Sequence, residues 1–304
     1  MPDDRIKNYL HLHLIVFIWG FTAVLGALIS IDSIPLVWWR MLIAVGMIFL
    51  YMKWKKISFE WSGSGSLSRK RLSSLIIAGM VIALHWVTFF GAIKASNVSV
   101  TLAMMSTGAF FTSLLEPMFT SKKFVWYESI FGIVIIGALY YIFKVETEYV
   151  LGMVLGLTSA MLSSIFTILN VRFVKEHPPS MISFYELLSG VALLSLFFIF
   201  LPVDFVMPWQ LTSMDWIYML LLSSVCTAYA FIVGVKVMKF LSAYTVMLTT
   251  NLEPVYGIIL AFAILGDSEQ MTTEFYFGAI AILVVIITNG IIKTKFSSRR
   301  KVNG

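Results

Sequence analysis

The stretch NLEPVYGIILAF, residues 251–262, places a carboxylate and a proline inside a run of otherwise mostly apolar residues. Glu253 lies about eleven residues into the apolar segment 242–264, close to the membrane midplane, where a carboxylate is unfavourable unless it is paired, protonated or in contact with water. Pro254 has no amide hydrogen to donate to the Thr250 carbonyl, so we expect a kink beside a free carbonyl group. With the hydroxyl group of Thr250 and the amide group of Asn251, this stretch could bind an ammonium group, a hydroxyl group or a proton. The alternative is a kink whose glutamate only caps the backbone or pairs with a basic side chain.

Two more ionisable residues follow aromatic pairs in two other apolar segments. Arg40 follows the Trp pair at 38–39, and Glu186 follows Phe184 and Tyr185. The two segments are expected to run in opposite directions, so each residue could line one gate of a cavity with its aromatic neighbours. The alternative is an interfacial residue that reaches the headgroup region, which a long arginine does more easily than a glutamate.

The pair His85-Trp86 falls in the middle of another apolar segment. A histidine inside a membrane is a candidate proton relay, although on an apolar helix it is usually a hydrogen-bonded packing residue. Asn170 is a weaker candidate of the same kind, and Asn97 is explained more simply as a helix cap.

Two further features have structural explanations. A second Glu-Pro pair, Glu116-Pro117, lies close to the end of its apolar segment, where the glutamate can reach the interface and the proline can end the helix. Small residues at intervals of four predict a helix face that a second helix can approach closely, and these are Gly152, Gly156, Ala160 and Ser164.

Motifs of enzymes and of nucleotide-driven pumps are missing. The sequence has no HExxH, GxSxG or Walker A motif, and no Cys/His cluster has the spacing of metal ligands. We therefore expect no enzyme, no catalytic residue, no cofactor and no metal. Any transport would be driven by an ion gradient or by the gradient of the solute.

The composition is that of a membrane protein. Of 304 residues, 59% are hydrophobic and 12% charged, against about 25% charged in soluble proteins. The single cysteine, Cys226, lies in an apolar segment and forms no intrachain disulfide. The N-terminal apolar run continues past residue 30 without a clear cleavage site, so we interpret it as a membrane span and not as a signal peptide.

Apolar runs of about 20 residues are long enough to cross a bilayer. They predict an all-α membrane protein of ten transmembrane helices, at 11–30, 34–52, 72–93, 97–119, 124–143, 150–172, 181–201, 215–235, 242–264 and 275–292. The basic segment 53–71, with its Gly/Ser stretch, predicts a flexible surface loop.

Basic residues orient these helices. If the N-terminus is cytoplasmic, 19 of the 22 Lys and Arg residues fall on the cytoplasmic side, Lys94 and Lys144 fall outside, and Arg40 lies within a span. This asymmetry follows the positive-inside rule and predicts that both termini are cytoplasmic. It also explains the net charge of +6 without nucleic-acid binding, which we exclude.

The chain repeats itself at an offset of 146 residues. The pattern ExxFG begins at Glu128 and again at Glu274, and VWWRML at 37–42 aligns with SFYELL at 183–188. Repeats of five helices each would enter the membrane in opposite orientations. Inverted repeats with a binding site near the midplane are typical of secondary transporters. We expect the first repeat at residues 1–146 and the second at 147–304.

These features carry a resemblance to a known family. Trp19-Gly20, PLVWWR at 35–40 and LSAYTVMLTTNLEPVYGIILAFAILGD at 241–267 resemble the EamA family of the drug/metabolite transporter superfamily. The resemblance covers nearly the whole chain and implies ten helices, two inverted repeats and transport. It implies no particular substrate, because similar proteins move amino acids, sugars, nucleobases or cationic compounds.

The sequence thus predicts a multi-pass secondary transporter of the bacterial inner membrane that moves a small polar or amphipathic metabolite by alternating access, with export favoured. Expected partners are the small-molecule substrate, the lipid bilayer and, as a hypothesis, protons. Proton-coupled efflux of drugs or cations and a non-transporting sensor or membrane enzyme remain alternatives. Direction, coupling ion and oligomeric state, including a homodimer, stay open.

Overall fold

The computed structural model describes residues 2–57, 59, 69–120 and 126–302, so most of the predicted Gly/Ser loop lies outside the described residues. The described residues form helices and connecting turns, without a strand. The α-helices are α1 (Pro2–Leu28), α2 (Ser33–Trp54), α3 (Arg69–Ala95), α4 (Val98–Met105), α5 (Gly108–Phe119), α6 (Trp126–Val145), α7 (Val150–Phe173), α8 (Pro179–Phe200), α9 (Ser213–Ser223), α10 (Ala230–Val237), α11 (Ala243–Thr250), α12 (Glu253–Leu265) and α13 (Thr273–Val302). Short 3₁₀ turns are η1 (Thr147–Tyr149), η2 (Pro208–Gln210) and η4 (Gly266–Glu269), and η3 (Ser224–Tyr229) is a π-helical turn.

Many of these helices can span a membrane. In the described part of the chain, eight helical stretches are long and apolar enough, and two shorter apolar helices cover Ile130–Val145 and Thr273–Val285. Three of the eight contain two α-helices each, because α4 joins α5, α9 joins α10 through η3, and α11 joins α12. The protein is therefore a multi-pass, all-helical membrane protein.

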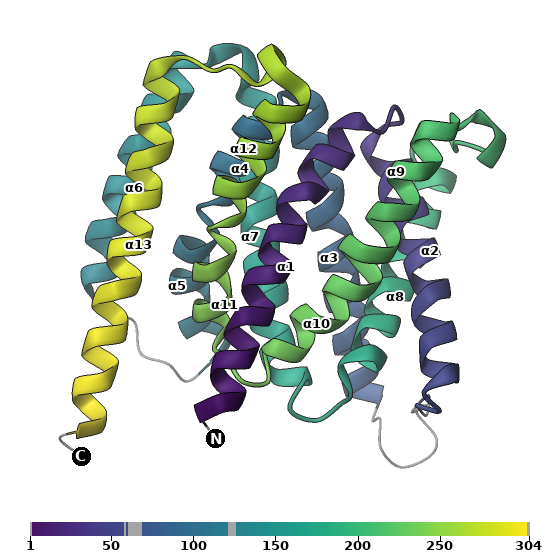
Figure 1. Ribbon diagram of the computed structural model, residues 1–304, viewed down its shortest axis with the longest axis horizontal. Helices are drawn as coiled ribbons and strands as arrows, with labels where there is room; N and C mark the ends of the chain where they lie inside the picture. The colour runs from purple at the N-terminus through teal and green to yellow at the C-terminus, as the bar shows by residue number, and fades with distance from the viewer. Residues whose placement is uncertain (1, 58, 60–68, 121–125, 303–304) are drawn as a thin grey trace.

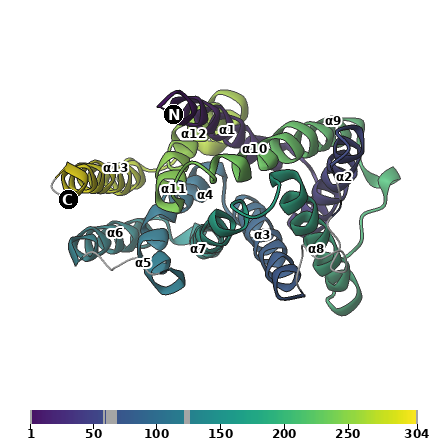
Figure 2. The ribbon, with the colours of Figure 1, turned by 90° about the horizontal axis from the view of Figure 1, so that it is seen from below.

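Figure 1 shows the helices standing roughly side by side, with the N- and C-termini at the same end of the molecule. Figure 2, seen along the helices, places α6 and α13 at one edge and α2, α8 and α9 at the other. A large cluster of buried apolar side chains packs α1, α2, α3, α7, α8 and α10 together. A smaller cluster, with Met104, Met247 and Phe275, attaches α6 and α13 to α4, α7 and α11.

Two transmembrane stretches are broken in the middle. The break between α11 and α12 lies at Asn251 and Leu252, directly before Pro254 in the first turn of α12. A second break, at Ser106 and Thr107, interrupts the segment 97–119 that the sequence predicted as one helix. No proline causes it. Instead, the Ser106 hydroxyl donates to the Ala103 carbonyl at 2.6 Å, and the Thr107 hydroxyl donates to the Met104 carbonyl at 2.7 Å. Such hydroxyl bonds compete with the helical ladder and satisfy the carbonyls that end α4.

Carboxylates join the helices at the end of the molecule opposite the termini. Asp215, at the start of α9, accepts from the Ser30 amide at 2.7 Å and from its hydroxyl at 2.8 Å, which ties α9 to the end of α1. Glu269 accepts from the Val98 and Ser99 amides at 3.1 and 2.8 Å and caps α4. These bonds connect α1 to α9, and α4 to the turn after α12, at this end of the bundle.

The predicted small-residue face of α7 lies against α3 and α4. A Cβ atom added at Gly152 would come within 2.4 Å of the Ser96 hydroxyl, and one added at Gly156 within 2.8 Å of the Met104 Cβ. Ser164 on the same face donates to the Gly108 carbonyl at 2.8 Å, where α5 begins. The prediction of close helix approach along this face is confirmed.

Candidate functional site

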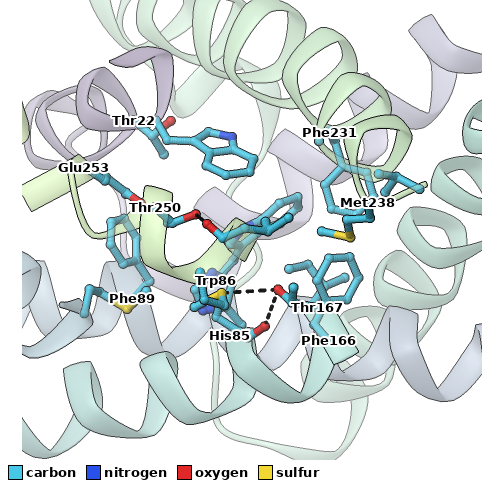
Figure 3. Close-up of a pocket in the computed structure, with 18 of the residues that line it drawn as sticks. Thr22, His85, Trp86, Phe89, Phe166, Thr167, Phe231, Met238, Thr250 and Glu253 are labelled. Atoms are coloured by element: carbon cyan, nitrogen blue, oxygen red, sulfur yellow. Dashed lines mark hydrogen bonds between the residues drawn. The ribbon is translucent and has the colours of Figure 1, made fainter. Parts of the chain in front are cut away.

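A cavity lies between α1, α2, α3, α7, α10 and the broken helices (Figure 3). Its volume is about 70 Å³, taken as the space open to the centre of a water molecule. The wall is mainly aromatic, formed by Trp19, Trp86, Phe89, Phe166 and Phe231, with methionines at 105, 238 and 247. Hydroxyl groups come from Thr22, Ser163, Thr167 and Thr250. Small-molecule sites usually have such a lining, which is mainly apolar with a few polar groups.

Arg40 enters the cavity from α2 and is 1% exposed. Its Nε donates to the Thr227 hydroxyl at 2.6 Å, and its guanidinium carbon lies 3.9 Å from the centre of the Trp86 ring. The Nη1 atom is buried and has no hydrogen-bond partner. Because Arg40 is held on two sides, it does not extend to the interface. It presents a fixed positive charge with unused donors in the membrane interior.

Glu253 reaches the same cavity from the first turn of α12 and is 7% exposed. Arg40 lines the same cavity. Within the described part of the chain, however, no basic nitrogen lies within 4.0 Å of the Glu253 carboxyl oxygens. The Arg40 guanidinium and the Glu253 carboxyl group therefore line one cavity without direct contact. Thr250, one turn earlier, also lines the cavity, and its hydroxyl donates to the Val246 carbonyl at 3.0 Å.

His85 lines the cavity from α3 and is oriented by α7. Its Nδ1 lies 3.0 Å from the Ser159 carbonyl and 2.8 Å from the Ser159 hydroxyl. A carbonyl oxygen only accepts, so Nδ1 carries a hydrogen. The other ring nitrogen, Nε2, is then the acceptor in the neutral ring. The predicted neighbour Trp86 also lines the cavity, where it stacks on Arg40 and packs 5.6 Å from the Phe231 ring centre.

The two broken helices meet beside the cavity. With the Asn251 amide oriented as a donor, its nitrogen lies 3.0 Å from the Ser106 carbonyl and 3.3 Å from the Met247 carbonyl. Asn251 thus links one break directly to the other and satisfies a carbonyl at the end of α4. The predicted polar stretch around Pro254 therefore serves two purposes. Glu253 faces the cavity, while Asn251 binds the Ser106 carbonyl at the point where the two helix breaks cross.

Glu186 and Tyr185 do not line this cavity. Glu186 is fully buried on α8, and its Oε1 accepts from the Asn170 amide at 2.8 Å. Tyr185 packs against Phe184, with ring centres 5.6 Å apart. Sequence position gives the depth of such residues but not the direction in which the side chain points, so the expected symmetry with Arg40 does not place Glu186 at the cavity.

The remaining polar candidates have local roles. Asn97 accepts from the Val100 amide at 2.8 Å and caps α4, as predicted. Glu116 is buried near the end of α5, and Pro117 lies inside that helix, two residues before its last residue, Phe119. Neither is among the residues that line the cavity.

Sequence reasoning missed several residues of the site. Thr227 orients Arg40 from the π-helical turn, where one extra residue per turn rotates its side chain toward α2. Ser159 orients His85, and Thr22 adds a hydroxyl from α1. Serine and threonine are common in apolar helices, so their identity alone gave no signal. The resemblance did point to Gly20, where an added Cβ would lie 3.1 Å from the Gly257 amide nitrogen of α12.

Comparison with known proteins places the chain among transporters. The model of the EamA-like transporter family matches residues 7–144 and again residues 150–290. An uncharacterized transporter of Archaeoglobus fulgidus is 24% identical over 291 residues, covering 93% of this chain and 97% of the relative. A solved crystal structure with 13% identity has the same fold, with a TM-score of 0.66 over 95% of this chain and 98% of that one. Since the family model covers most of the sequence, the chain belongs to the EamA-like transporter family.

Proposed function

We propose that this protein is a secondary transporter that carries a small amphipathic solute with an amino-acid-like pair of charges, favouring export, through alternating access to the central cavity. The observation that carries the proposal is that the buried guanidinium of Arg40 and the buried carboxyl group of Glu253 line one cavity without touching. A pair with a purely structural role would gain most by direct contact, because buried ions are stable only when paired or hydrogen-bonded.

A zwitterionic solute fits between these two groups. Its carboxylate would accept from the free Arg40 donors, and its ammonium group would bind the Glu253 carboxylate. An apolar side chain would rest against Trp19, Phe166 and Phe231. His85, with its acceptor nitrogen, and the Thr250 hydroxyl are further candidates for contact with the solute or with a proton.

The proposed architecture is ten transmembrane helices in two inverted five-helix repeats, residues 1–146 and 147–304. Support comes from the two separate matches of one family model and from the helix break that each half contains. The charge asymmetry supports an inner-membrane location with cytoplasmic termini. Rocking of the two halves about the Asn251–Ser106 crossing would expose the cavity to one side at a time.

Purified protein in liposomes tests this function. Liposomes loaded with unlabelled L-leucine, L-threonine, a sugar or a quaternary ammonium compound are diluted into the corresponding labelled solute, and counterflow is measured. We expect counterflow of a zwitterion, and a much slower rate in Glu253→Gln. Absence of counterflow for every solute by folded protein would contradict a transport function for these classes.

The runner-up is proton-coupled efflux of an organic cation. The observation that favours it is a carboxylate among aromatic rings, which is a suitable environment for a cation. Arg40 opposes it, since a fixed positive charge in the same cavity repels a cation. Counterflow of the quaternary ammonium compound but of no zwitterion would favour this alternative.

A further inference from the structure

A second buried acid lies outside the cavity, between α7 and α8. Glu186 is fully buried, and its Oε1 accepts the Asn170 amide at 2.8 Å. Its other oxygen, Oε2, is buried without a hydrogen-bond partner, and so is the Asn170 Oδ1. Two polar side chains with no exposed surface thus have two acceptor oxygens that lack donors. Buried polar atoms rarely lack a hydrogen-bond partner, so we expect these two oxygens to bind a ligand.

Charged groups on the surrounding helices do not neutralise Glu186. Helices α2, α3 and α10 pack against α8. In the part of the chain that the structure describes, no Lys, Arg or His nitrogen lies within 4.0 Å of the Glu186 carboxyl oxygens. Among the described side chains of α2, α3, α7, α8, α10 and the α7–α8 connection, the other titratable or charged residues are Arg40, Tyr51, Lys53, Arg71, His85, Lys94, Arg172, Lys175, Glu176, His177, Tyr185 and Lys236.

Most of these residues are engaged elsewhere or exposed. Arg40 and His85 line the cavity, and Arg71 pairs with Glu176 at 3.3 Å on the surface. Lys53, Arg172 and Lys236 are exposed, whereas His177 is buried in the connection between α7 and α8.

The missing ligand is best explained as a proton. Hard metal cations take six or more oxygen ligands, whereas this site offers two free oxygens. The nearby Phe166 carbonyl already accepts from the Asn170 amide at 3.3 Å. A single hydrogen on the Glu186 carboxyl removes the uncompensated charge. It can then be donated to Asn170 Oδ1 once the amide has turned over.

We propose that Glu186 and Asn170 form a proton-binding site, separate from the solute cavity, whose occupancy is relayed to the cavity wall through Asn170. The relay is direct, because Asn170 Nδ2 contacts both the Glu186 carboxylate and the carbonyl of Phe166, a residue of the cavity wall. The use of this site to drive transport rests on the proposed function.

The proton step requires no other reactant. A proton from water forms an O–H bond with the Glu186 carboxylate and neutralises it. The Asn170 amide turns so that Oδ1 accepts this hydrogen, and Nδ2 then releases the Phe166 carbonyl. Loss of the proton to water reverses each change. The distance to water is short, since Glu186 lies seven residues after Pro179, the first residue of α8, or roughly 10 Å along the helix.

Infrared difference spectroscopy tests the site without any solute. Spectra of the purified protein in lipid nanodiscs are recorded from about pH 5 to about pH 9, a range over which a perturbed carboxyl group can titrate. We expect a protonated-carboxyl band that disappears as the pH rises. It should be missing in Glu186→Gln and retained in Glu116→Gln, a matched control that removes another buried carboxyl on a different helix. In Asn170→Ala the band should remain but shift in frequency, because the carboxyl loses its hydrogen-bond partner.

Two results would overturn the proposal. A titrating band that is identical in the wild type and in Glu186→Gln would assign the proton to another group. A Glu186 band that does not change with pH would make this residue a permanently neutral structural carboxyl. If Glu186→Gln does not fold, the Asn170→Ala variant provides the test. A protonated-carboxyl band whose frequency does not shift in that variant would contradict the proposed site. Because no solute is used, a failure of transport leaves this result interpretable, and a failure here leaves the solute cavity untouched.

Discussion

Replacing Glu253 by glutamine removes one charge from the cavity with little change in size. The carboxylate is buried, faces Arg40 and has no basic nitrogen within 4.0 Å in the described residues, so the wild-type fold does not depend on an ion pair at this position. We therefore expect Glu253→Gln to fold with unchanged or slightly higher thermal stability, because a neutral amide is easier to bury than a carboxylate.

The effect on transport should be large. A hydrogen bond to a charged group contributes about 1.5–3 kcal/mol, and each 1.4 kcal/mol is a factor of about ten, so loss of the solute's ammonium contact should slow transport roughly 10- to 150-fold. The assay is the initial rate of L-leucine counterflow in liposomes, divided by the amount of folded protein. Glu116→Gln, which removes a buried carboxyl that does not line the cavity, is the control.

A near-normal rate for Glu253→Gln would refute this reasoning. It would mean that the glutamate supports the helix break without carrying the solute or a proton. Glu253→Leu should then fail through poor folding, since it removes hydrogen bonding as well as charge.

Three other predictions concern topology, the helix break and the hydrogen bonds of Asp215. Reporter fusions after residues 148 and 208 should lie outside the cell and one after 301 in the cytoplasm; a cytoplasmic signal at 148 would contradict the inverted repeat. In Pro254→Ala, the new backbone N–H can donate a hydrogen bond to the Thr250 carbonyl and stiffen the helix break. Counterflow should then slow several-fold at an equal or higher melting temperature; faster counterflow would contradict a hinge there. Asp215→Asn weakens the bonds to Ser30 and should lower the free energy of unfolding by about 1–3 kcal/mol, as measured by thermal unfolding in detergent; no change would show that this contact is dispensable.

Much of the fold follows from hydropathy and charge, because backbone groups in lipid must be satisfied within helices. The position of the α11–α12 break could be predicted for a local reason: Pro254 cannot complete the helical ladder. The break at Ser106 could not be predicted, since hydroxyl groups and the distant Asn251 amide stabilise it. A contact between residues so far apart in sequence leaves no local pattern.

The candidate site likewise contains residues that the sequence could predict and residues that it could not. Arg40, His85 and Glu253 are ionisable residues in apolar helices, which singles them out in a sequence, and the structure brings them to one cavity. Glu186 has the same signature but points elsewhere. The exposed side of α8, with Leu188, Leu196 and Ile199, is as apolar as its buried side, so no hydrophobic periodicity indicates the direction of Glu186. Thr227 is found only through the π-helical turn that aims it at Arg40.

The central claim is that Arg40 and Glu253 together recognise a solute with two opposite charges. The most direct measurement is competition by three matched compounds against L-leucine counterflow: L-leucine itself, its amide, which lacks the negative charge, and 4-methylpentanoate, which lacks the ammonium group. In the wild type, L-leucine should compete best. In Glu253→Gln, 4-methylpentanoate should compete as well as L-leucine, and in Arg40→Gln the amide should do so. An unchanged order of competition in both variants would contradict the claim.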